Sequence, residues 1–189
     1  MDKPLFTEAN YNSNDGFLTK IWGPPCWHFI HTMSFNYPVK PTLEQKKKYR
    51  QFILSLEDVL PCGKCRENLK KNFKRLPLTM KDMENRDTFS RYVYNLHEVV
   101  NTMLHKRSNL TFEQVRERYE HFRSRCATKK GRKKKNHTRK SMFSGAKEEG
   151  CTEPIHHKKK SKCILRIVPD ETKCKTLEID EQCLVTPTI

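Results

Sequence analysis

Two cysteines, Cys62 and Cys65, stand two residues apart in the segment VLPCGKCRENLKK, directly after Pro61. Because proline suits the first turn of a helix, the pair is expected at a helix N-terminus. Unpaired backbone N–H groups and the positive end of the helix dipole stabilise a thiolate at that place. Lys64 and Arg66 add positive charge beside it. This arrangement favours thiol–disulfide exchange, in which a thiolate is the attacking species.

The residues alone leave two other interpretations open. A CxxC pair is half of a four-ligand zinc site, and a zinc- or nucleic-acid-binding module would combine it with the histidines and the basic segment of the chain. However, the other six cysteines form no second CxxC, no downstream His-x3–5-His follows, and the βαβ context of a thioredoxin-like site is absent. A helical bundle with incidental cysteines is the other interpretation. The balance favours redox work over zinc.

Two further residue pairs suit a planar, hydrogen-bonding ligand. Trp27 and His31 lie one helical turn apart, and so do His97 and Asn101. Taken singly, Trp27 is better explained as a core residue, and His97 and Asn101 are better explained as helix-surface residues. Two such pairs flanking a CxxC favour a bound electron carrier, because a dithiol that gives two electrons to O2 needs one.

The elements that must position these residues are helices. Helical spacing of apolar residues predicts them over residues 26–38, 41–60, 62–73, 86–106 and 111–125. Capping boxes are expected at Thr42 with Gln45 and at Thr111 with Gln114. In the second helix, Phe52, Ile53, Leu56, Val59 and Leu60 are predicted to share one face. The fold class is therefore all-α.

The chain of 189 residues carries a net charge of +16, unevenly distributed. Residues 129–140 contain eight cations and no acid, which predicts a solvated linker and leaves contact with nucleic acid or another polyanion open. Residues 127–189 are expected to form a basic, largely disordered tail, with an optional hairpin around 164–168 and 177–179. Its four cysteines, at positions 151, 163, 174 and 183, are too sparsely surrounded by apolar residues for a core of their own.

Targeting signals are not evident in the sequence. No run of 18 or more apolar residues exists, so no transmembrane segment is expected. The first 16 residues contain no apolar stretch typical of a secretory signal, and they contain acids and no arginine, unlike a mitochondrial presequence.

Taken together, the motifs resemble the Erv/ALR family of FAD-linked sulfhydryl oxidases over about residues 20–126. The family order is a Trp-x3-His helix, a Tyr-Pro helix end, a CxxC, a His/Asn helix, a lysine and an Arg-aromatic pair. In this chain these motifs are Trp27 with His31, Tyr37 with Pro38, Cys62 with Cys65, His97 to Asn101, Lys106, and Arg118 with Tyr119. The segment IWGPPCWHFIH is most similar to members encoded by large DNA viruses.

The resemblance implies a fold and an activity. Four helices would surround FAD, a short fifth helix would cover its adenine side, and two chains would form a homodimer. The domains would be an arm at 1–19, the oxidase domain at 20–126 and the tail at 127–189. Thiols of client proteins would attack Cys62, Cys65 would lie next to the flavin, and O2 would accept the electrons and become H2O2.

The resemblance also assigns roles to the cofactor-binding residues. Trp27 and Tyr119 would supply apolar and stacking surface. The polar set would bind or neutralise the ring, ribose and phosphates of FAD; it comprises His31, His97, Asn101, Lys106 and Arg118. No metal is expected. The compartment would be the host cytoplasm or virion for a viral protein, and otherwise a disulfide-permissive compartment such as the mitochondrial intermembrane space.

The chain departs from the family pattern at several positions. Glu98 replaces an asparagine, and the structural disulfide of cellular members would fall at Tyr94 and Phe112. Cys26 has no counterpart, and Cys126 lies near the C-terminal cysteine of the family without an evident partner. The tail lacks the close cysteine pair that usually shuttles electrons. The CxxC and the main flavin contacts are unaffected by these departures.

Overall fold

The computed structural model describes residues 7–125 and 153–154. The chain divides into two compact units, Met1–Phe112 and Glu113–Ile189, and each is described by itself. The elements of the first unit are α1 (Glu8–Tyr11), α2 (Thr19–Phe35), α3 (Leu43–Val59), α4 (Gly63–Arg75) and α5 (Arg86–Met103). The next helix, α6 (Phe112–Glu120), begins at the last residue of that unit.

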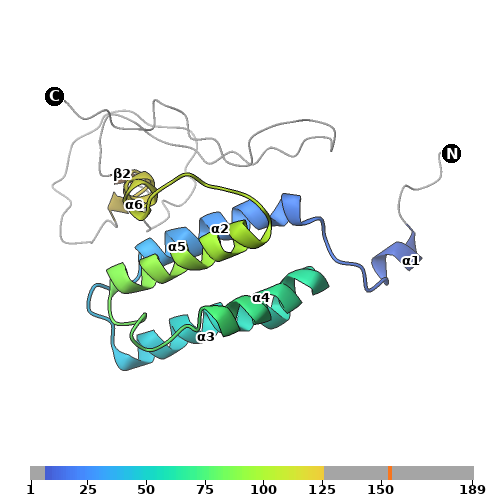
Figure 1. The fold of residues 1–189 in the computed structure, drawn as a ribbon, viewed down its shortest axis with the longest axis horizontal. Coiled ribbons are helices and arrows are strands. Elements are labelled where there is room, and N and C mark those ends of the chain that lie inside the picture. The colour runs from blue at the N-terminus through green and yellow to red at the C-terminus, as the bar shows by residue number, and fades with distance from the viewer. Residues whose placement is uncertain (1–6, 126–152, 155–189) are drawn as a thin grey trace, which may run out of the picture. The chain divides into compact units, whose positions relative to one another are not determined.

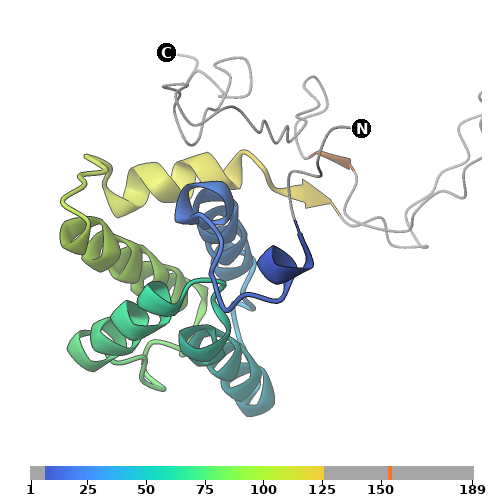
Figure 2. The ribbon, with the colours of Figure 1, turned by 90° about the vertical axis from the view of Figure 1, so that its right-hand side faces the viewer.

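Four helices of the first unit form a bundle. Helix α2 packs against α5, α3 packs against α4, and α4 also contacts α5 (Figure 1). Figure 2 shows the four helices nearly end-on. The buried core between them is apolar and consists of Ile30, Tyr37, Ile53, Leu69, Phe73, Leu78, Met83, Phe89, Tyr92, Val93 and Leu96. The predicted all-helical bundle is confirmed.

Local sequence signals explain where these helices begin and end. Thr42 and Gln45 form the predicted capping box of α3, and Asn85 with Thr88 forms another at α5. Helix α3 ends at Val59, just before Pro61, as its sequence predicts. In the Tyr-Pro motif that follows α2, the fully buried Tyr37 donates a hydrogen bond from its hydroxyl to the Met83 carbonyl at 2.9 Å. This bond ties the chain after α2 to the loop that precedes α5.

Helix α2 corrects the sequence-based prediction. It begins at Thr19, seven residues before the predicted start at position 26, and it contains both Pro24 and Pro25. Proline is unfavourable inside a helix because it lacks an N–H and its ring clashes with the carbonyl four residues earlier. Only the two N–H groups of adjacent prolines are lost here, and both lie within the first two turns. The helix therefore extends into the predicted arm, which also contains α1.

The predicted apolar face of α3 was partly wrong. Ile53 is fully buried, but Phe52 is 39% and Val59 66% exposed. A helix in a bundle buries only the side that faces its neighbours, and apolar residues beside that stripe remain at the surface.

The second unit contains the rest of α6 and two short strands. Strands β1 (Ser124–Arg125) and β2 (Glu153–Pro154) pair antiparallel, with Ser124 opposite Pro154 and Arg125 opposite Glu153. The predicted linker at 129–140 and the predicted hairpin lie outside the described residues.

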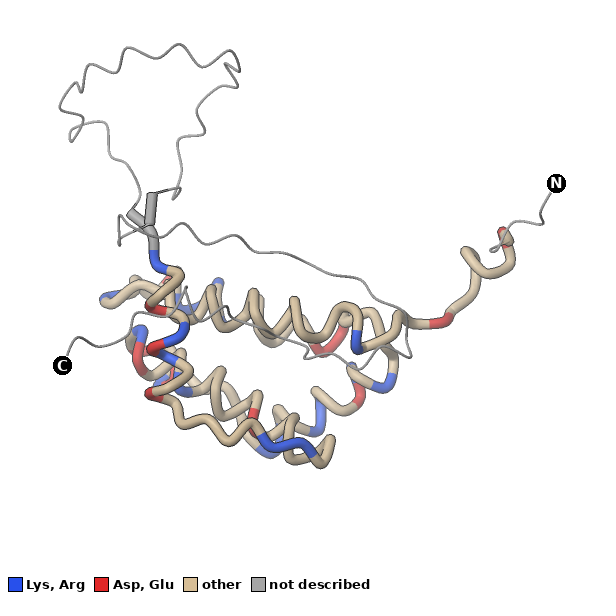
Figure 3. Tube along the Cα trace, turned by 90° about the horizontal axis from the view of Figure 1, so that it is seen from above, with Lys and Arg blue, Asp and Glu red and all other residues tan. Residues whose placement is uncertain are grey.

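Cations and acids are interspersed along the described helices (Figure 3). Within the described part of the chain, every helix is too short or too polar to cross a bilayer.

Candidate active site

A disulfide joins Cys62 and Cys65 at the N-terminus of α4. Cys62 is the N-cap residue, and its Sγ accepts a hydrogen bond from the Cys65 N–H at 3.2 Å. Both side chains are half-buried, so a second thiol has access to them. The predicted position of the pair at a helix start is therefore observed. A thiolate formed there meets unpaired N–H groups and the positive end of the α4 dipole.

The segment before α2 lies against this disulfide. The Phe17 N–H donates to the Pro61 carbonyl at 2.8 Å, and the Trp22 indole donates to the Phe17 carbonyl at 3.1 Å. The Thr19 hydroxyl lies 3.5 Å from Cys65 Sγ and 4.0 Å from Cys62 Sγ. Sequence reasoning missed Thr19 because it placed this residue in a loose arm. No signal in the sequence points to Thr19, because its contact with Cys65 joins residues 46 positions apart and depends on where the starts of α2 and α4 lie.

Three predicted cofactor ligands contact one another between α2 and α5. The Trp27 indole stacks on the His97 imidazole with ring centroids 4.0 Å apart and an interplanar angle of 5°. His31 Nε2 lies 2.9 Å from His97 Nδ1, within hydrogen-bond distance. These residues therefore form one aromatic and polar cluster, named here the Trp-His-His cluster.

Both histidines of the cluster are neutral at physiological pH. Burial, with the charges of His97 and His28, lowers the pKa of His31 from 6.5 to about 3. Burial also lowers the pKa of His97 to about 4, helped by Lys106 and opposed by Glu98. In a neutral pair, one ring donates a hydrogen bond to the other. Each ring keeps a second nitrogen that can donate or accept another hydrogen bond.

The buried histidines predict a loss of stability in acid. Between pH 6.5 and about 4 the unfolded chain binds protons that folded His31 and His97 do not, so stability falls as the pH drops. The slope is about 1.4 kcal/mol per pH unit for each histidine. We expect urea unfolding to show this, and His97→Asn to flatten it. The exposed His105, whose φ of 55° asparagine tolerates, provides the control His105→Asn, which keeps the wild-type slope. A His97→Asn slope equal to that of wild type would contradict the prediction.

Asn101 and Lys106 lie at the C-terminal end of α5. The Asn101 amide donates to Glu98 Oε1 at 2.9 Å, and the Lys106 N–H donates to the Asn101 carbonyl at 2.8 Å. Glu98, which departs from the family pattern, thus orients Asn101. The backbone bond holds the start of the next loop, and the exposed Lys106 with it, at the helix end.

The other predicted ligands, Arg118 and Tyr119, lie on α6 in the second unit, where Tyr119 contacts Phe122 edge to face. Their role toward a cofactor stays a prediction. Cys26 is a free, half-buried thiol packed against the core, and burial raises its pKa. Tyr94 and Phe112, which stand where cellular members have a disulfide, pack edge to face with centroids 5.8 Å apart.

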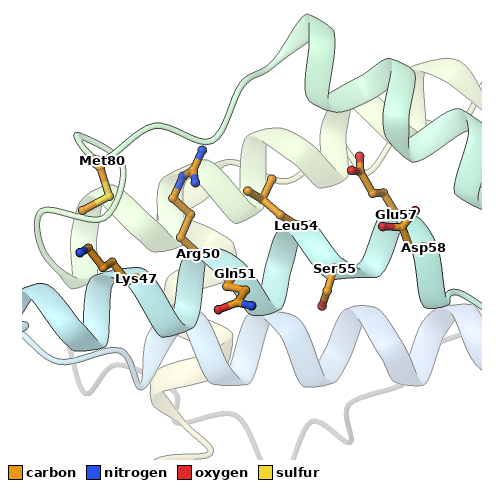
Figure 4. Close-up of a pocket in the computed structure, with 8 residues that line it drawn as sticks. All are labelled: Lys47, Arg50, Gln51, Leu54, Ser55, Glu57, Asp58 and Met80. Carbon is orange, nitrogen blue, oxygen red and sulfur yellow. The ribbon is translucent and has the colours of Figure 1, made fainter.

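A groove along α3 is separate from this set of residues. Figure 4 shows its lining, which mixes both charge signs with apolar side chains: Lys47, Arg50, Gln51, Leu54, Ser55, Glu57, Asp58 and Met80. None of the predicted site residues is among them. In the described ranges, no group of three or more His, Cys, Asp and Glu side chains is arranged to bind a metal ion.

Comparison with known proteins adds to this geometry. The model of the Erv1/Alr family matches residues 24–120, just over half of the chain. A protein named a probable FAD-linked sulfhydryl oxidase from Acanthamoeba polyphaga mimivirus is 36% identical over 99 residues, which are 52% of this chain and 68% of that protein. The FAD-linked sulfhydryl oxidase ERV1 of Arabidopsis thaliana is 32% identical over 44% of this chain and 42% of its own length.

A solved structure shares the fold. The crystal structure of a cysteine-to-serine mutant of Erv1 from Saccharomyces cerevisiae aligns with a TM-score of 0.50 and 23% identity, covering 56% of this chain and 66% of that one. The resemblance inferred from the motifs is confirmed by the family match and by the mimivirus relative. This chain belongs to the Erv1/Alr family.

Proposed function

We propose that the protein is an FAD-dependent thiol oxidase that forms disulfides in client proteins. The observation that carries this proposal is the Cys62–Cys65 disulfide, half-buried at the N-terminus of α4 in a chain of the Erv1/Alr family. A disulfide in that position accepts electrons from client thiols readily, because the helix end stabilises the thiolates that form. The names of the relatives support FAD as the cofactor, and they do not support the zinc alternative.

The residues on α2 and α5 fit such a cofactor. The stacked Trp27 and His97 rings offer an aromatic surface, and the neutral His31–His97 pair offers hydrogen-bonding nitrogens without a charge. The Asn101 amide adds a further polar group one turn from His97. These three side-chain types suit a planar, hydrogen-bonding ring. When bound, FAD takes two electrons from a dithiol and passes them to O2, giving H2O2.

The chain's own residues carry out the exchange with the client. A client thiolate attacks Cys62 Sγ, the Cys62–Cys65 bond breaks, and the electron pair goes to Cys65 Sγ. A second client thiolate then attacks the client sulfur of the mixed disulfide, and Cys62 leaves as a thiolate. The client gains a disulfide and the protein becomes a dithiol. The Cys65 N–H, which already donates to Cys62 Sγ, is positioned to stabilise that second leaving group.

The proposal is tested on the purified full-length protein. We expect visible flavin absorbance, and consumption of O2 with a small dithiol such as dithiothreitol, with about one H2O2 formed per O2. The measurements are the absorption spectrum, an oxygen electrode and a peroxide assay. A colourless protein that takes up no oxygen would contradict the proposal, and bound zinc in its place would favour the alternative.

The oxidase domain, predicted at residues 20–126, is proposed to form a homodimer, and α2 begins one residue before that range, at Thr19. Apolar side chains at the surface support the dimer: Ile21 and Phe29 on α2 are 47% and 57% exposed. Phe29 also meets Phe52 of α3 edge to face, with centroids 6.2 Å apart. Burying this strip against a second copy would remove it from water. Sedimentation velocity distinguishes a dimer from a monomer.

A polyanion partner and the cellular compartment are proposed on separate grounds. A contact between a polyanion and residues 129–140 rests on the charge of the sequence, since this segment lies outside the described residues. The proposed compartment is the host cytoplasm or virion for a viral protein, in line with the viral relatives, and otherwise a disulfide-permissive compartment such as the mitochondrial intermembrane space, in line with a yeast relative that is named mitochondrial. Fluorescence microscopy of tagged protein separates these locations.

A further inference from the structure

A threonine hydroxyl reaches the disulfide from a helix distant in sequence. Thr19 is the first residue of α2, 43 positions before Cys62, and its Oγ1 lies 3.5 Å from Cys65 Sγ. It is farther, 4.0 Å, from Cys62 Sγ. Sulfur is larger than oxygen, so a hydroxyl at the shorter of these distances is within reach of a hydrogen bond to it. The hydroxyl therefore lies closer to the cysteine that receives the electron pair in the first exchange step.

We propose that Thr19 is a third catalytic side chain, whose hydroxyl donates a hydrogen bond to the Cys65 thiolate and so makes Cys65 a better leaving group. The inference rests on the proposed function, in which Cys62–Cys65 is the working disulfide. When a client thiolate bonds to Cys62 Sγ, the Sγ–Sγ bond breaks and both of its electrons go to Cys65 Sγ. A donor beside that atom stabilises the charge where it develops, and a hydrogen bond to a charged group is stronger than one to a neutral group.

The two sulfur atoms differ in their nearest donor, although the Thr19 hydroxyl also makes a longer hydrogen bond, at 4.0 Å, to Cys62 Sγ. Cys62 Sγ already accepts the Cys65 N–H at 3.2 Å, a bond supplied by α4 itself. Cys65 is the third residue of α4, so its side chain lies beyond the N-cap position that the helix start serves best. The hydroxyl that reaches Cys65 comes from α2. Since a lower thiol pKa in the leaving cysteine speeds exchange, the α2 donor would control the step in which Cys65 leaves.

Backbone contacts hold Thr19 at this place. The bond from the Phe17 N–H to the Pro61 carbonyl fixes the chain two residues before Thr19, and the Trp22 indole closes over the Phe17 carbonyl. Gly16 permits this approach, because a Cβ at that position would lie 2.9 Å from the Pro61 oxygen and 3.1 Å from Cys62 Cα. A side chain there would push the segment away from the CxxC loop.

The experiment compares Thr19→Val, which removes the hydroxyl at nearly constant shape, with Thr19→Ser, which keeps it. In a Cys62→Ser background of the full-length protein, the rate of Cys65 alkylation by iodoacetamide is measured against pH, and peptide mass spectrometry separates Cys65 from the other cysteines. In the otherwise wild-type chain, the Cys62–Cys65 disulfide is equilibrated with glutathione under nitrogen. Neither readout depends on turnover through FAD.

We expect Thr19→Val to raise the pH midpoint of Cys65 alkylation by about 0.5–1 unit and to make the disulfide about three- to tenfold harder to reduce. The effect is moderate because Thr19 is exposed and water partly replaces the lost donor. Thr19→Ser keeps the pH midpoint within about 0.3 unit of wild type and the reduction equilibrium within about twofold of it. Gly16→Ala, which leaves the hydroxyl in the sequence but displaces its segment, shifts both values in the same direction as Thr19→Val.

Two results would overturn the inference. Wild-type values for Thr19→Val would mean that the hydroxyl has no influence on Cys65. Equal shifts in the Val and Ser variants would mean that packing, and not the hydroxyl, is responsible. If circular dichroism shows that Thr19→Val does not fold, Thr19→Ala and Gly16→Ala decide the question by the same criteria. Failure of the proposed function is distinguishable, because wild type would then consume no O2 with a dithiol whatever the Thr19 variants do.

Discussion

Replacing Cys65 with serine is expected to abolish dithiol oxidation, by at least about a hundredfold, while FAD stays bound. Both sulfur atoms are needed to form and resolve a disulfide, so Cys62→Ser should have the same effect. The pocket proposed for the cofactor comes from α2 and α5, and serine is close to cysteine in size. Oxygen uptake with dithiothreitol and the ratio of flavin to protein absorbance measure the two effects separately.

The chain contains a matched control for this prediction. Cys26 is a free, half-buried thiol on α2, and Cys26→Ser removes a sulfur atom without touching the disulfide. We expect this variant to keep its rate within about twofold of wild type. If Cys65→Ser instead consumed oxygen at a near-normal rate, the working disulfide would have to be formed by other cysteines of the chain.

Replacing His97 with alanine is expected to weaken FAD binding by about tenfold or more. The change removes the ring that stacks on Trp27 and the hydrogen-bond partner of His31, and it leaves a cavity between α2 and α5. His97→Phe keeps an aromatic ring and loses the nitrogens, so it separates stacking from hydrogen bonding. Equilibrium dialysis or flavin fluorescence measures the affinity of each variant.

The matched control for His97 lies on the same helix. Asn95 is exposed and two residues away, on a different side of α5, so Asn95→Ala should bind FAD as wild type does. Urea unfolding of each variant checks whether a loss of flavin only follows a loss of fold. An unchanged flavin-to-protein ratio in folded His97→Ala would mean that the Trp-His-His cluster supports the bundle but does not bind the cofactor.

Much of this protein was predictable from local patterns. The capping box at Thr42 and the proline after α3 mark helix ends through interactions within a few residues, which is why the start of α3 and the placement of Cys62 at the start of α4 were correct. The order of short motifs indicated the family, since each is a local group of residues at helical spacing. The position of the CxxC at a helix start and the absence of a second CxxC already favoured redox work over zinc, and the order of the motifs strengthened that interpretation.

Contacts between distant segments were beyond such patterns. A sequence places Trp27 next to His31 by helical spacing, but only the packing of α2 against α5 stacks Trp27 on His97 and buries the imidazole pair enough to keep it neutral. Ile53 is fully buried while its apolar neighbour Phe52 is 39% exposed, since the direction of a neighbouring helix decides which side of α3 is covered.

Thr19 is the clearest case. Nothing about a threonine before two prolines points to a cysteine 46 positions later, and two adjacent prolines are themselves unfavourable inside a helix. Its hydroxyl reaches Cys65 because α2 continues through the prolines and because the Phe17–Pro61 bond holds the start of that helix on the CxxC loop. Both conditions are met only when the bundle has folded, because they depend on where the start of α2 lies relative to the start of α4 and not on the residues around either one.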